Sequence, residues 1–224
     1  MNLKPKNPNT SILWDRLLFE RDAELLRSPY YVDKINRVYR FLKNGKGKFL
    51  DIGFGTGNLE RKILSKDTAL EIYGIDFSKK AVANAKKQFR GNFYVARLQK
   101  LPFENSFFDF IVMLDVLEHI PKSEAKKVLD GINKVIKKNG SLVISVPLNE
   151  NLKEMNREGT NFNMHLRQYT PSIIEKELGL SGFRVIRKEF IFAFNKYYFL
   201  KNVIMKIFPN IRKPNLLLIF ARKR

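Results

Sequence analysis

The chain has 224 residues, of which 44% are hydrophobic and 12% aromatic, so it can bury a substantial core. It contains no cysteine, which excludes disulfides, thiolate metal sites and cysteine nucleophiles. This composition fits a reducing compartment, and we expect a cytoplasmic protein. The sequence has no secretory leader pattern and no apolar run of about 18 residues, so neither export nor a membrane span is expected.

The formal net charge is +20, and half of this excess lies in the last part of the sequence. Residues 184–224 contain eleven lysines and arginines but a single acid, Glu189, which leaves a net charge of +10. One interpretation is a surface for anions such as nucleic acid, acidic lipid or a phosphorylated substrate. The other is a solvated basic surface without a specific partner, and the composition leaves both open.

Apolar runs of strand length alternate with amphipathic segments along the chain. Two helices are expected first, at 12–19 and 35–42, before a turn at 43–48. Strands are expected at 48–53, 70–75, 92–96, 110–114 and 141–146. Helices between them are expected at 58–65, 78–88 and 123–138, with Ser78 capping the second and Gly140 ending the third. The alternation predicts a parallel sheet wound on both faces, with ligands at the carboxyl ends of its strands.

The stretch FLDIGFGTGNLE, residues 49–60, places three glycines directly after the first strand. Gly53, Gly55 and Gly57 allow a ligand to lie against bare backbone. Asn58 stands where a dinucleotide fingerprint has its third glycine, and no G-K-[ST] follows, so an NAD site is disfavoured and a P-loop is excluded. Asp76 ends the second strand, where a carboxylate can accept both hydroxyls of a ribose; its alternative role is to cap the next helix.

Several segments stand in an order that matches one known family. They are FLDIGFGTGNLE (49–60), YGIDFSKKAVANAKK (73–87), LPFENSFFDFIVMLDVLEHI (101–120), GSLVISVP (140–147) and HLRQYTPSIIEKELGLSGFRVI (165–186). Together they resemble the class I S-adenosylmethionine-dependent methyltransferases, with a domain similar to methyltransferase type 11. The resemblance implies an α/β fold, a doubly wound Rossmann-like sheet of seven mostly parallel strands with helices on both faces. A C-terminal antiparallel hairpin would form from about 183–192 and 215–222.

The resemblance also implies one methyltransferase domain with three parts. These are a helical N-terminal cap at 1–44, a cofactor-binding core at 45–147, and a substrate-side part with the C-terminal hairpin at 148–224. The cofactor would be S-adenosylmethionine, released as S-adenosylhomocysteine. The residues that would hold its methionine part or lie near its amino group are Asp51, Gly53, Phe54, Gly55, Gly57, Leu114 and Asp115.

The other half of the cofactor would lie beyond the second and third strands. By the resemblance, Asp76 would bind the ribose and Phe77 would flank the adenine. The family usually has an acid after the third strand, but Arg97 stands at that position. Arginine accepts no hydrogen bond, so the adenine would be held by Leu98, by Gln99 or by backbone groups.

The two histidines, His119 and His165, fall where the family places substrate or catalytic groups, and each is a candidate general base beside Asp115. If DVLEHI is helical, Asp115, Glu118 and His119 share one face. With His165 they would form a divalent-metal set that resembles the one in ubiquinone-biosynthesis O-methyltransferases and small-RNA 2′-O-methyltransferases. The preferred alternative is that no metal binds and that His119 packs or forms a hydrogen bond beside the cofactor.

The segments outside the core predict further features. The helices before the sheet would cover the cofactor, and Trp14, Tyr30 and Tyr31 would roof the pocket, although core packing suits Trp14 better. Residues 196–208 predict an extra helix with an apolar stripe of Tyr197, Leu200, Val203, Ile204 and Ile207. Such a stripe is expected to pack onto the sheet, and a membrane-surface helix is the alternative.

The sequence therefore predicts a methyltransferase that methylates oxygen on a small organic, glycan or lipid-type acceptor. RNA or another polyanion is the second hypothesis, because the C-terminal segment is basic. A non-catalytic cofactor- or nucleic-acid-binding protein is the third, because of Arg97. Residues 148–170 are expected to shape the acceptor pocket, and the oligomeric state is left open.

Overall fold

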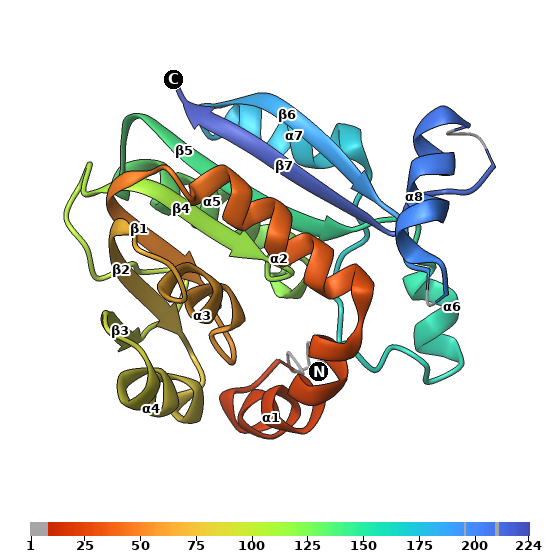
Figure 1. Ribbon diagram of the computed structural model, residues 1–224, viewed down its shortest axis with the longest axis horizontal. Coiled ribbons are helices and arrows are strands. Elements are labelled where there is room, and N and C mark those ends of the chain that lie inside the picture. Colours follow the sequence, from red (N-terminus) through yellow and green to blue (C-terminus); the bar gives the residue numbers. More distant parts are fainter. Residues whose placement is uncertain (1–8, 195, 209–210) are drawn as a thin grey trace, which may run out of the picture.

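The computed structural model describes residues 9–194, 196–208 and 211–224, and Figure 1 shows helices layered on one sheet. Within these residues seven strands form that sheet in the order β3-β2-β1-β4-β5-β7-β6. They are β1 (Lys46–Ile52), β2 (Ala69–Asp76), β3 (Asn92–Val95), β4 (Phe108–Leu114), β5 (Ile136–Pro147), β6 (Phe183–Ile191) and β7 (Leu216–Lys223). All are parallel except β7, which runs antiparallel to both β5 and β6. The predicted fold class, with its antiparallel C-terminal hairpin, is confirmed.

Helices cover both faces of the sheet and its carboxyl edge (Figure 1). One face carries α2 (Pro29–Leu42), α3 (Asn58–Leu64) and α4 (Lys79–Gln88), and the other carries α5 (Lys122–Val135) and α7 (Pro171–Leu180). The carboxyl edge carries α1 (Ser11–Arg27), the 3-10 turn η1 (Leu117–His119), α6 (Leu152–Arg157) and α8 (Tyr198–Ile207). None of the helices in the described ranges is long and apolar enough to cross a membrane.

Each face of the sheet has its own hydrophobic core, because successive strand residues point to opposite sides. In β1, for example, Phe49 belongs to the core under α2 and Leu50 to the core under α5. The predicted apolar stripe of α5 is buried as expected, at Ala125, Val128, Leu129, Ile132 and Val135. The sheet is thus buried on both sides, and its carboxyl edge is where the loops are free to form a site.

The predicted end of the helix at 123–138 was wrong. α5 ends at Val135, and Ile136 already pairs with Phe108 in β5. The pairing then skips to Ser141, and Asn139 has a φ of 62° inside the irregular stretch. Gly140 does not stop the helix: a Cβ there would lie 2.7 Å from Cγ1 of Ile136, so glycine is required for close packing within the strand.

The predicted packing of the extra helix was also wrong. The stripe at Tyr197, Leu200, Val203, Ile204 and Ile207 faces solvent and not the sheet. The buried residues of α8 are instead Tyr198, Asn202 and Met205, on the opposite side of the helix. The alternation of buried and exposed positions is helical as expected, but the side that packs on the protein is the other one.

Candidate active site

The loop after β1 is bent by three glycines in the left-handed region. Gly53, Gly55 and Gly57 have φ angles of 74°, 60° and 77°, which residues with a side chain rarely adopt. A Cβ on Gly53 would lie 2.6 Å from Cγ2 of Val116, so glycine is what lets the end of β4 approach the loop. The glycine loop and the residues that follow β4 therefore form one continuous surface at the carboxyl edge.

Asp76 connects this loop to the start of α4. Its Oδ2 accepts the Gly55 N–H at 3.0 Å, and its Oδ1 accepts the Ser78 N–H at 2.8 Å. Burial raises the pKa of Asp76, while the backbone N–H donors oppose that rise. The helix is capped by Ser78, whose hydroxyl accepts the Ala81 N–H at 2.9 Å. The capping role thus belongs to Ser78, and the Asp76 carboxylate faces the loop.

A pair of buried acids lies beneath the loop. Asp51, near the end of β1, is 4% exposed, and Glu60, in the first turn of α3, is fully buried. Burial, and then repulsion from Glu60, raises the pKa of Asp51 well above its usual value. Burial raises the pKa of Glu60 to about 7. These two carboxyl groups therefore stay protonated to higher pH than exposed carboxyl groups do. They form a buried polar pair beneath the loop.

Helix α1 covers the same loop from outside. The Asp22 carboxylate accepts the Thr56 hydroxyl at 2.6 Å and the Asn58 side-chain amide at 2.8 Å. Leu18 lies 3.2 Å from the position of a Cβ on Gly55, and Asp15 accepts the Ser78 hydroxyl at the start of α4. The N-terminal helix thus closes over the loop, as expected of a cap.

Asp115 follows β4 in a left-handed conformation with a φ of 53°. Its carboxylate accepts hydrogen bonds from the buried ammonium of Lys34 and from the Ser145 hydroxyl. Burial opposes ionisation of Asp115, but the adjacent Lys34 ammonium outweighs it and holds the pKa of Asp115 below its usual value. Asp115 is therefore an ionised acid paired with a buried lysine, while its own side chain is 38% exposed.

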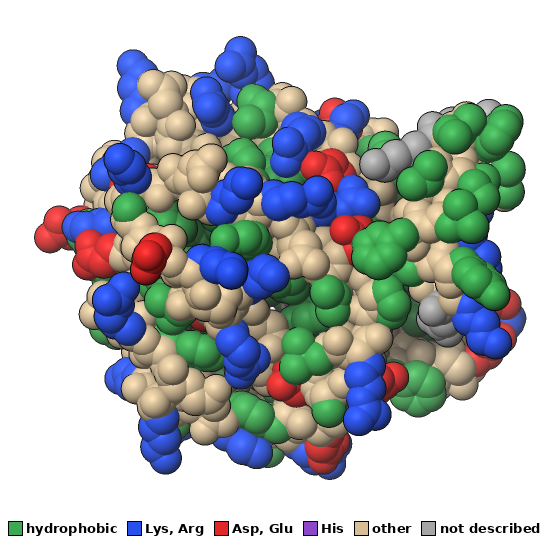
Figure 2. Space-filling model, in the orientation of Figure 1, with side chains coloured by type: hydrophobic (Ala, Val, Ile, Leu, Met, Phe, Trp, Pro, Cys, Tyr) green, Lys and Arg blue, Asp and Glu red, His purple; other side chains and the backbone are tan. Residues whose placement is uncertain are grey.

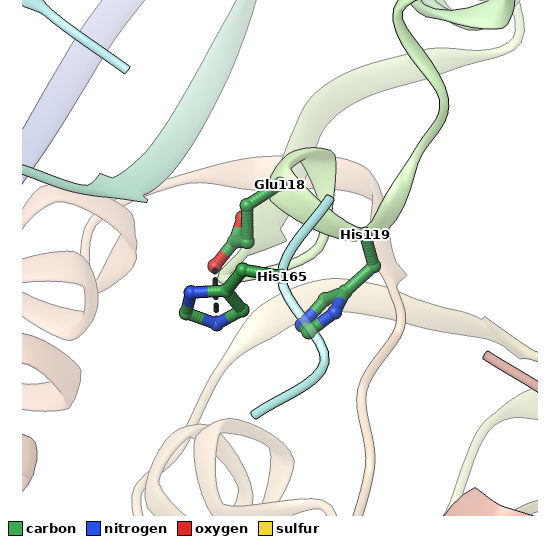
Figure 3. A group of neighbouring side chains, drawn as sticks. All are labelled: Glu118, His119 and His165. Carbon is green, nitrogen blue, oxygen red and sulfur yellow. Dashed lines mark ion pairs between the residues drawn. The ribbon is translucent and has the colours of Figure 1, made fainter. Parts of the chain in front are cut away.

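Two histidines and two glutamates meet next to Asp115. Figure 3 shows Glu118 and His119 extending from η1 towards His165, which comes from the segment between α6 and α7. His165 Nδ1 lies 2.8 Å from both carboxylate oxygens of Glu150, and its Nε2 lies 3.9 Å from Oε1 of Glu118. The rings of His119 and His165 contact edge to face at 4.9 Å between centroids. The predicted pairing of the two histidines in space is what the structure has.

The environment sets the charge of each group in this cluster. Glu118 is fully buried, and neither of its carboxylate oxygens has a hydrogen-bond partner among the described residues. Burial raises the pKa of Glu118 well above its usual value. Burial lowers the pKa of His119 to about 4, so that imidazole is neutral near pH 7. The Nδ1–H of His119 points to the Met164 carbonyl at 3.4 Å.

The other expected site residues are distributed differently. Trp14 was expected in the core, but its half-buried ring contacts His119 edge to face at 4.9 Å, so it lies at the site.

The Phe54 side chain is buried against Phe93, so only the backbone of Phe54 is available to a ligand in the loop. The Gln99 side chain donates to Glu124 of α5. Leu98 packs on the core and Arg97 is exposed, while Phe77 is half-buried beside Asp76.

Comparisons with known proteins place this geometry in a family. A model described as "Methyltransferase domain" matches residues 50–144. Demethylmenaquinone methyltransferase of Thermotoga maritima is 30% identical over 171 residues, which cover 70% of each chain. The chain belongs to the class I S-adenosylmethionine-dependent methyltransferases. The predicted family and enzyme class are confirmed, and the non-catalytic hypothesis is discarded.

More distant relatives agree with this assignment. The ubiquinone/menaquinone biosynthesis C-methyltransferase UbiE of Desulfotalea psychrophila is 29% identical over 102 residues, 44% of this chain and 41% of that protein. The crystal structure of magnesium protoporphyrin IX methyltransferase from Synechocystis with bound SAH has a TM-score of 0.64 at 20% identity, over 87% of this chain and 84% of that one. The cofactor of this methyltransferase is S-adenosylmethionine, as the family resemblance implied.

The methyltransferase brings together only part of the hypothetical metal set. Glu118, His119 and His165 offer ligand atoms within 4.8 Å of one another, whereas Asp115 is bound to Lys34. Within DVLEHI only Leu117–His119 is helical, as a 3-10 turn, so the α-helical spacing that was expected to align Asp115 with Glu118 and His119 is not formed. The donor types of these three residues fit a metal site, and His165 Nε2 lies 3.9 Å from Oε1 of Glu118.

Three residues of the site were missed from the sequence. Lys34 occurs on the apolar side of α2, where a lysine gives no sign that it is buried. Glu60 occurs in the first turn of α3, where an acid is ordinarily explained by the helix dipole. Glu150 lies in the 148–170 segment that was expected to shape the pocket, and no pattern connects it to His165. Each depends on a contact between segments far apart in the chain.

Proposed function

We propose that this methyltransferase transfers the methyl group to the oxygen of a hydroxyl on a small organic, glycan or lipid-type acceptor. The observation that carries the proposal is the contact of His165 with Glu150, beside His119. Methylation of a hydroxyl needs a proton acceptor, because the neutral hydroxyl is a poor nucleophile. A histidine held by a carboxylate supplies such an acceptor.

His165 is the proposed general base. Its Nδ1–H donates to Glu150, which fixes the tautomer and leaves Nε2 as the proton acceptor. The imidazolium formed after proton transfer stays 2.8 Å from the Glu150 carboxylate, which stabilises it. His119 is neutral and orients the acceptor or the His165 ring. The sulfonium of the cofactor is already an activated methyl donor, so the remaining task is to align the acceptor oxygen with it.

The cofactor-binding residues follow from the loop. Asp51 and the backbone of Gly53–Gly57 are proposed to hold the methionine part, with Leu114 and Asp115 beside it. Asp76 is proposed to accept the ribose hydroxyls, since its buried carboxylate already faces the loop. Phe77 and Leu98 are proposed to flank the adenine. The Gln99 side chain is bound to Glu124, so we assign the adenine contact at that position to backbone groups.

A second candidate is methylation of a ring carbon next to a hydroxyl. It is favoured by two relatives whose names concern menaquinone or ubiquinone, one of them named a C-methyltransferase. The same base serves this reaction, because removing the hydroxyl proton makes the neighbouring ring carbon nucleophilic.

A polyanionic acceptor has less support. Several basic residues of 184–224 are engaged within the protein, among them Arg187 with Glu189, Lys188 with Glu175, and Lys223 with two backbone carbonyls.

The experiment is methyl transfer from labelled S-adenosylmethionine to cell extract separated into RNA, protein, lipid and small-molecule fractions. Label is expected in the lipid or small-molecule fraction, and the position of the methyl in the isolated product distinguishes oxygen from carbon. A chelator is expected to leave the rate unchanged, because the proposed base accepts the proton without a metal. Label in RNA would contradict the proposal, and a rate that depends on added magnesium would assign Glu118, His119 and His165 to a metal.

Glu150→Gln tests the base directly. The variant keeps the shape of the side chain but weakens the contact that fixes His165, so kcat should fall about 10- to 100-fold. The affinity for S-adenosylmethionine, measured by calorimetry, should not change, since Glu150 lies on the acceptor side. Glu158→Gln, on the exposed end of the same segment, is the matched control and should retain full activity. An unchanged kcat in Glu150→Gln would remove His165 as the base.

A further inference from the structure

Helix α8 carries most of its large apolar residues on the solvent side, whereas an ordinary surface helix carries them on the side that packs on the protein. Its inward side carries Tyr198, Asn202 and Met205, which are all buried. Its outward side carries large apolar residues with high exposure: Phe199 at 70%, Leu200 at 62%, Val203 at 53% and Ile207 at 65%. The apolar surface continues at both ends of the helix through Tyr197, Phe208 and Ile211. We call the outward residues Tyr197, Phe199, Leu200, Val203, Ile204, Ile207, Phe208 and Ile211 the apolar face.

The inward side of α8 is held by specific polar contacts, so its orientation is fixed. The Asn202 amide donates to the carbonyls of Phe192 at 3.3 Å and Tyr198 at 3.0 Å. The Tyr198 hydroxyl donates to Asp33 of α2 at 2.8 Å. A rotation of the helix that buried the apolar face would break these bonds and leave Asn202 without its buried partners. The contacts of the inward side therefore keep the apolar face exposed in the folded protein.

The chain segment that carries the apolar face has charges of one sign. Residues 190–224 contain eight lysines and arginines and no acid. Lys196, Arg212 and Lys213 are exposed at the ends of α8, and Lys201 lies along it. The side chains of Lys201 and Arg212 lie over the Phe194 ring, at 5.4 Å and 4.6 Å from its centroid. Basic groups thus surround an apolar surface, and Figure 2 shows the hydrophobic side chains gathered at the end of the molecule that α8 occupies in Figure 1.

We propose that α8 is a membrane-surface helix whose apolar face enters the interface of a bilayer that contains anionic lipids. Contiguous exposed apolar surface marks an interaction site, and an aliphatic and aromatic face flanked by the basic residues of its own segment fits an anionic lipid surface. The helix spans ten residues, too few to cross a bilayer but suited to lie in its plane. An acidic protein partner would require several polar counterparts within this face, and of the residues that make up the apolar face only Tyr197 carries a polar group.

The position of α8 gives membrane attachment a consequence for the site. Tyr198 binds Asp33, and the next residue of α2, Lys34, forms the ion pair with Asp115. The contact that anchors α8 is thus one residue of α2 away from Lys34, which holds Asp115 at the site. Attachment would place the site at the lipid surface, where an acceptor dissolved in the bilayer is concentrated. The attachment itself does not depend on the proposed function, because it needs neither acceptor nor cofactor.

The test is co-sedimentation of the purified protein with vesicles of phosphatidylcholine alone and of phosphatidylcholine mixed with phosphatidylglycerol. The wild type should bind the mixed vesicles more tightly, by about fivefold for each basic residue near the surface. Leu200→Ser combined with Ile207→Ser should weaken binding to the mixed vesicles at least about tenfold, because two large apolar side chains are withdrawn from the interface. Both residues are exposed, so the double variant should retain the thermal stability of the wild type.

Ile12→Ser is the matched control, since Ile12 is 80% exposed on α1, away from the apolar face. It should bind vesicles as the wild type does. Hydrogen exchange should show protection of residues 197–208 on vesicle binding.

The proposal is overturned if the wild type binds neither vesicle or if the double variant binds like the wild type. It is also overturned if the wild type is a dimer in solution that the double variant dissociates, because the face would then be covered by a second copy. Loss of methyl transfer without loss of vesicle binding would count against the proposed function alone.

Discussion

Asp76 shows how a single carboxylate serves both the fold and the proposed cofactor site. It accepts N–H groups from Gly55 and Ser78 and remains buried at the loop. Asp76→Ala should weaken the affinity for S-adenosylmethionine at least about 100-fold, because hydrogen bonds to a charged acceptor contribute about 1.5–3 kcal/mol each. Calorimetric titration measures this. Asp109→Ala is the control: Asp109 also accepts a backbone N–H, from Lys48, but at the amino ends of the strands. If both variants lose affinity equally, the loss comes from destabilisation and not from ribose binding.

Glu60 makes the stability of the protein depend on pH in a defined direction. Burial raises its pKa from 4.5 to about 7, so the folded state favours the protonated form. Its contribution to stability is complete below about pH 4.5 and is lost as the pH rises through about 7. Glutamine is neutral throughout, so Glu60→Gln should gain stability relative to the wild type between about pH 4.5 and about pH 8, by up to about 3 kcal/mol.

Urea unfolding at several pH values within that range measures the difference in the free energy of unfolding between Glu60→Gln and the wild type. The exposed Glu24→Gln is the control, and its difference from the wild type should not depend on pH. A constant difference for Glu60→Gln would show that Glu60 is ionised in the fold and has a partner that stabilises its charge.

At the residue scale, the sequence predicted what is encoded locally. The glycine loop and Asp76 were recognised because their spacing along one β-α-β unit is set by the chain itself. Lys34, Glu60 and Glu150 were not recognised, since each acquires its role from a partner in another segment. His119 and His165 lie between these cases: their types indicated function, while their contact could be seen only in the fold.

At the scale of elements, α1 is the part whose role is most open to test. Asp22 connects it to the glycine loop through Thr56 and Asn58. Asp22→Ala should loosen this cover and make S-adenosylmethionine dissociate about tenfold faster, since a hydrogen bond to a charged group contributes about 1.5–3 kcal/mol. Stopped-flow displacement measures the rate, and proteolysis within α1 should accelerate in parallel. Glu24→Ala, on the exposed side of the same helix, should change neither; a normal dissociation rate for Asp22→Ala would mean that α1 does not retain the cofactor.

The elements themselves were predictable where one periodicity dominated. The strands and α4 matched because buried strands and a capped amphipathic helix leave strong local signals. The end of α5 was misjudged because the apolar Ile136 continues the helical stripe while its backbone already pairs with β4. The orientation of α8 was misjudged because periodicity identifies an apolar side without saying what covers it. The covered side is set by Asn202, which donates to Phe192 directly after β6, and by Tyr198, which donates to Asp33 of α2.

At the scale of the whole molecule, the basic residues behind the net charge of +20 are spread along the chain, and some of them bind groups within the protein. Lysine and arginine side chains are spread over the face shown in Figure 2 and do not gather into one continuous patch. The guanidinium of Arg187 packs on Phe220, at 4.0 Å from the ring centroid, and pairs with Glu189. Both contacts make Arg187 less available to an external anion. At the ends of α8, Lys196, Arg212 and Lys213 are exposed beside the apolar face, and Arg212 also lies over Phe194. This combination of charge and apolar surface supports the proposed contact of α8 with a lipid surface.

This distribution predicts weak, unspecific contact with RNA. Binding of this kind has a dissociation constant of about 10⁻⁴ to 10⁻⁶ M at physiological salt and weakens steeply as salt is added. We therefore expect RNA affinity to vanish between about 50 and about 200 mM salt, while methyl transfer to the isolated acceptor in detergent changes less than about threefold. Filter binding and the labelled-methyl assay, run on the same salt series, measure both. If transfer fell in step with RNA binding and the label were found in RNA, the basic C-terminal segment would be the substrate surface, and a nucleic acid would replace the small acceptor.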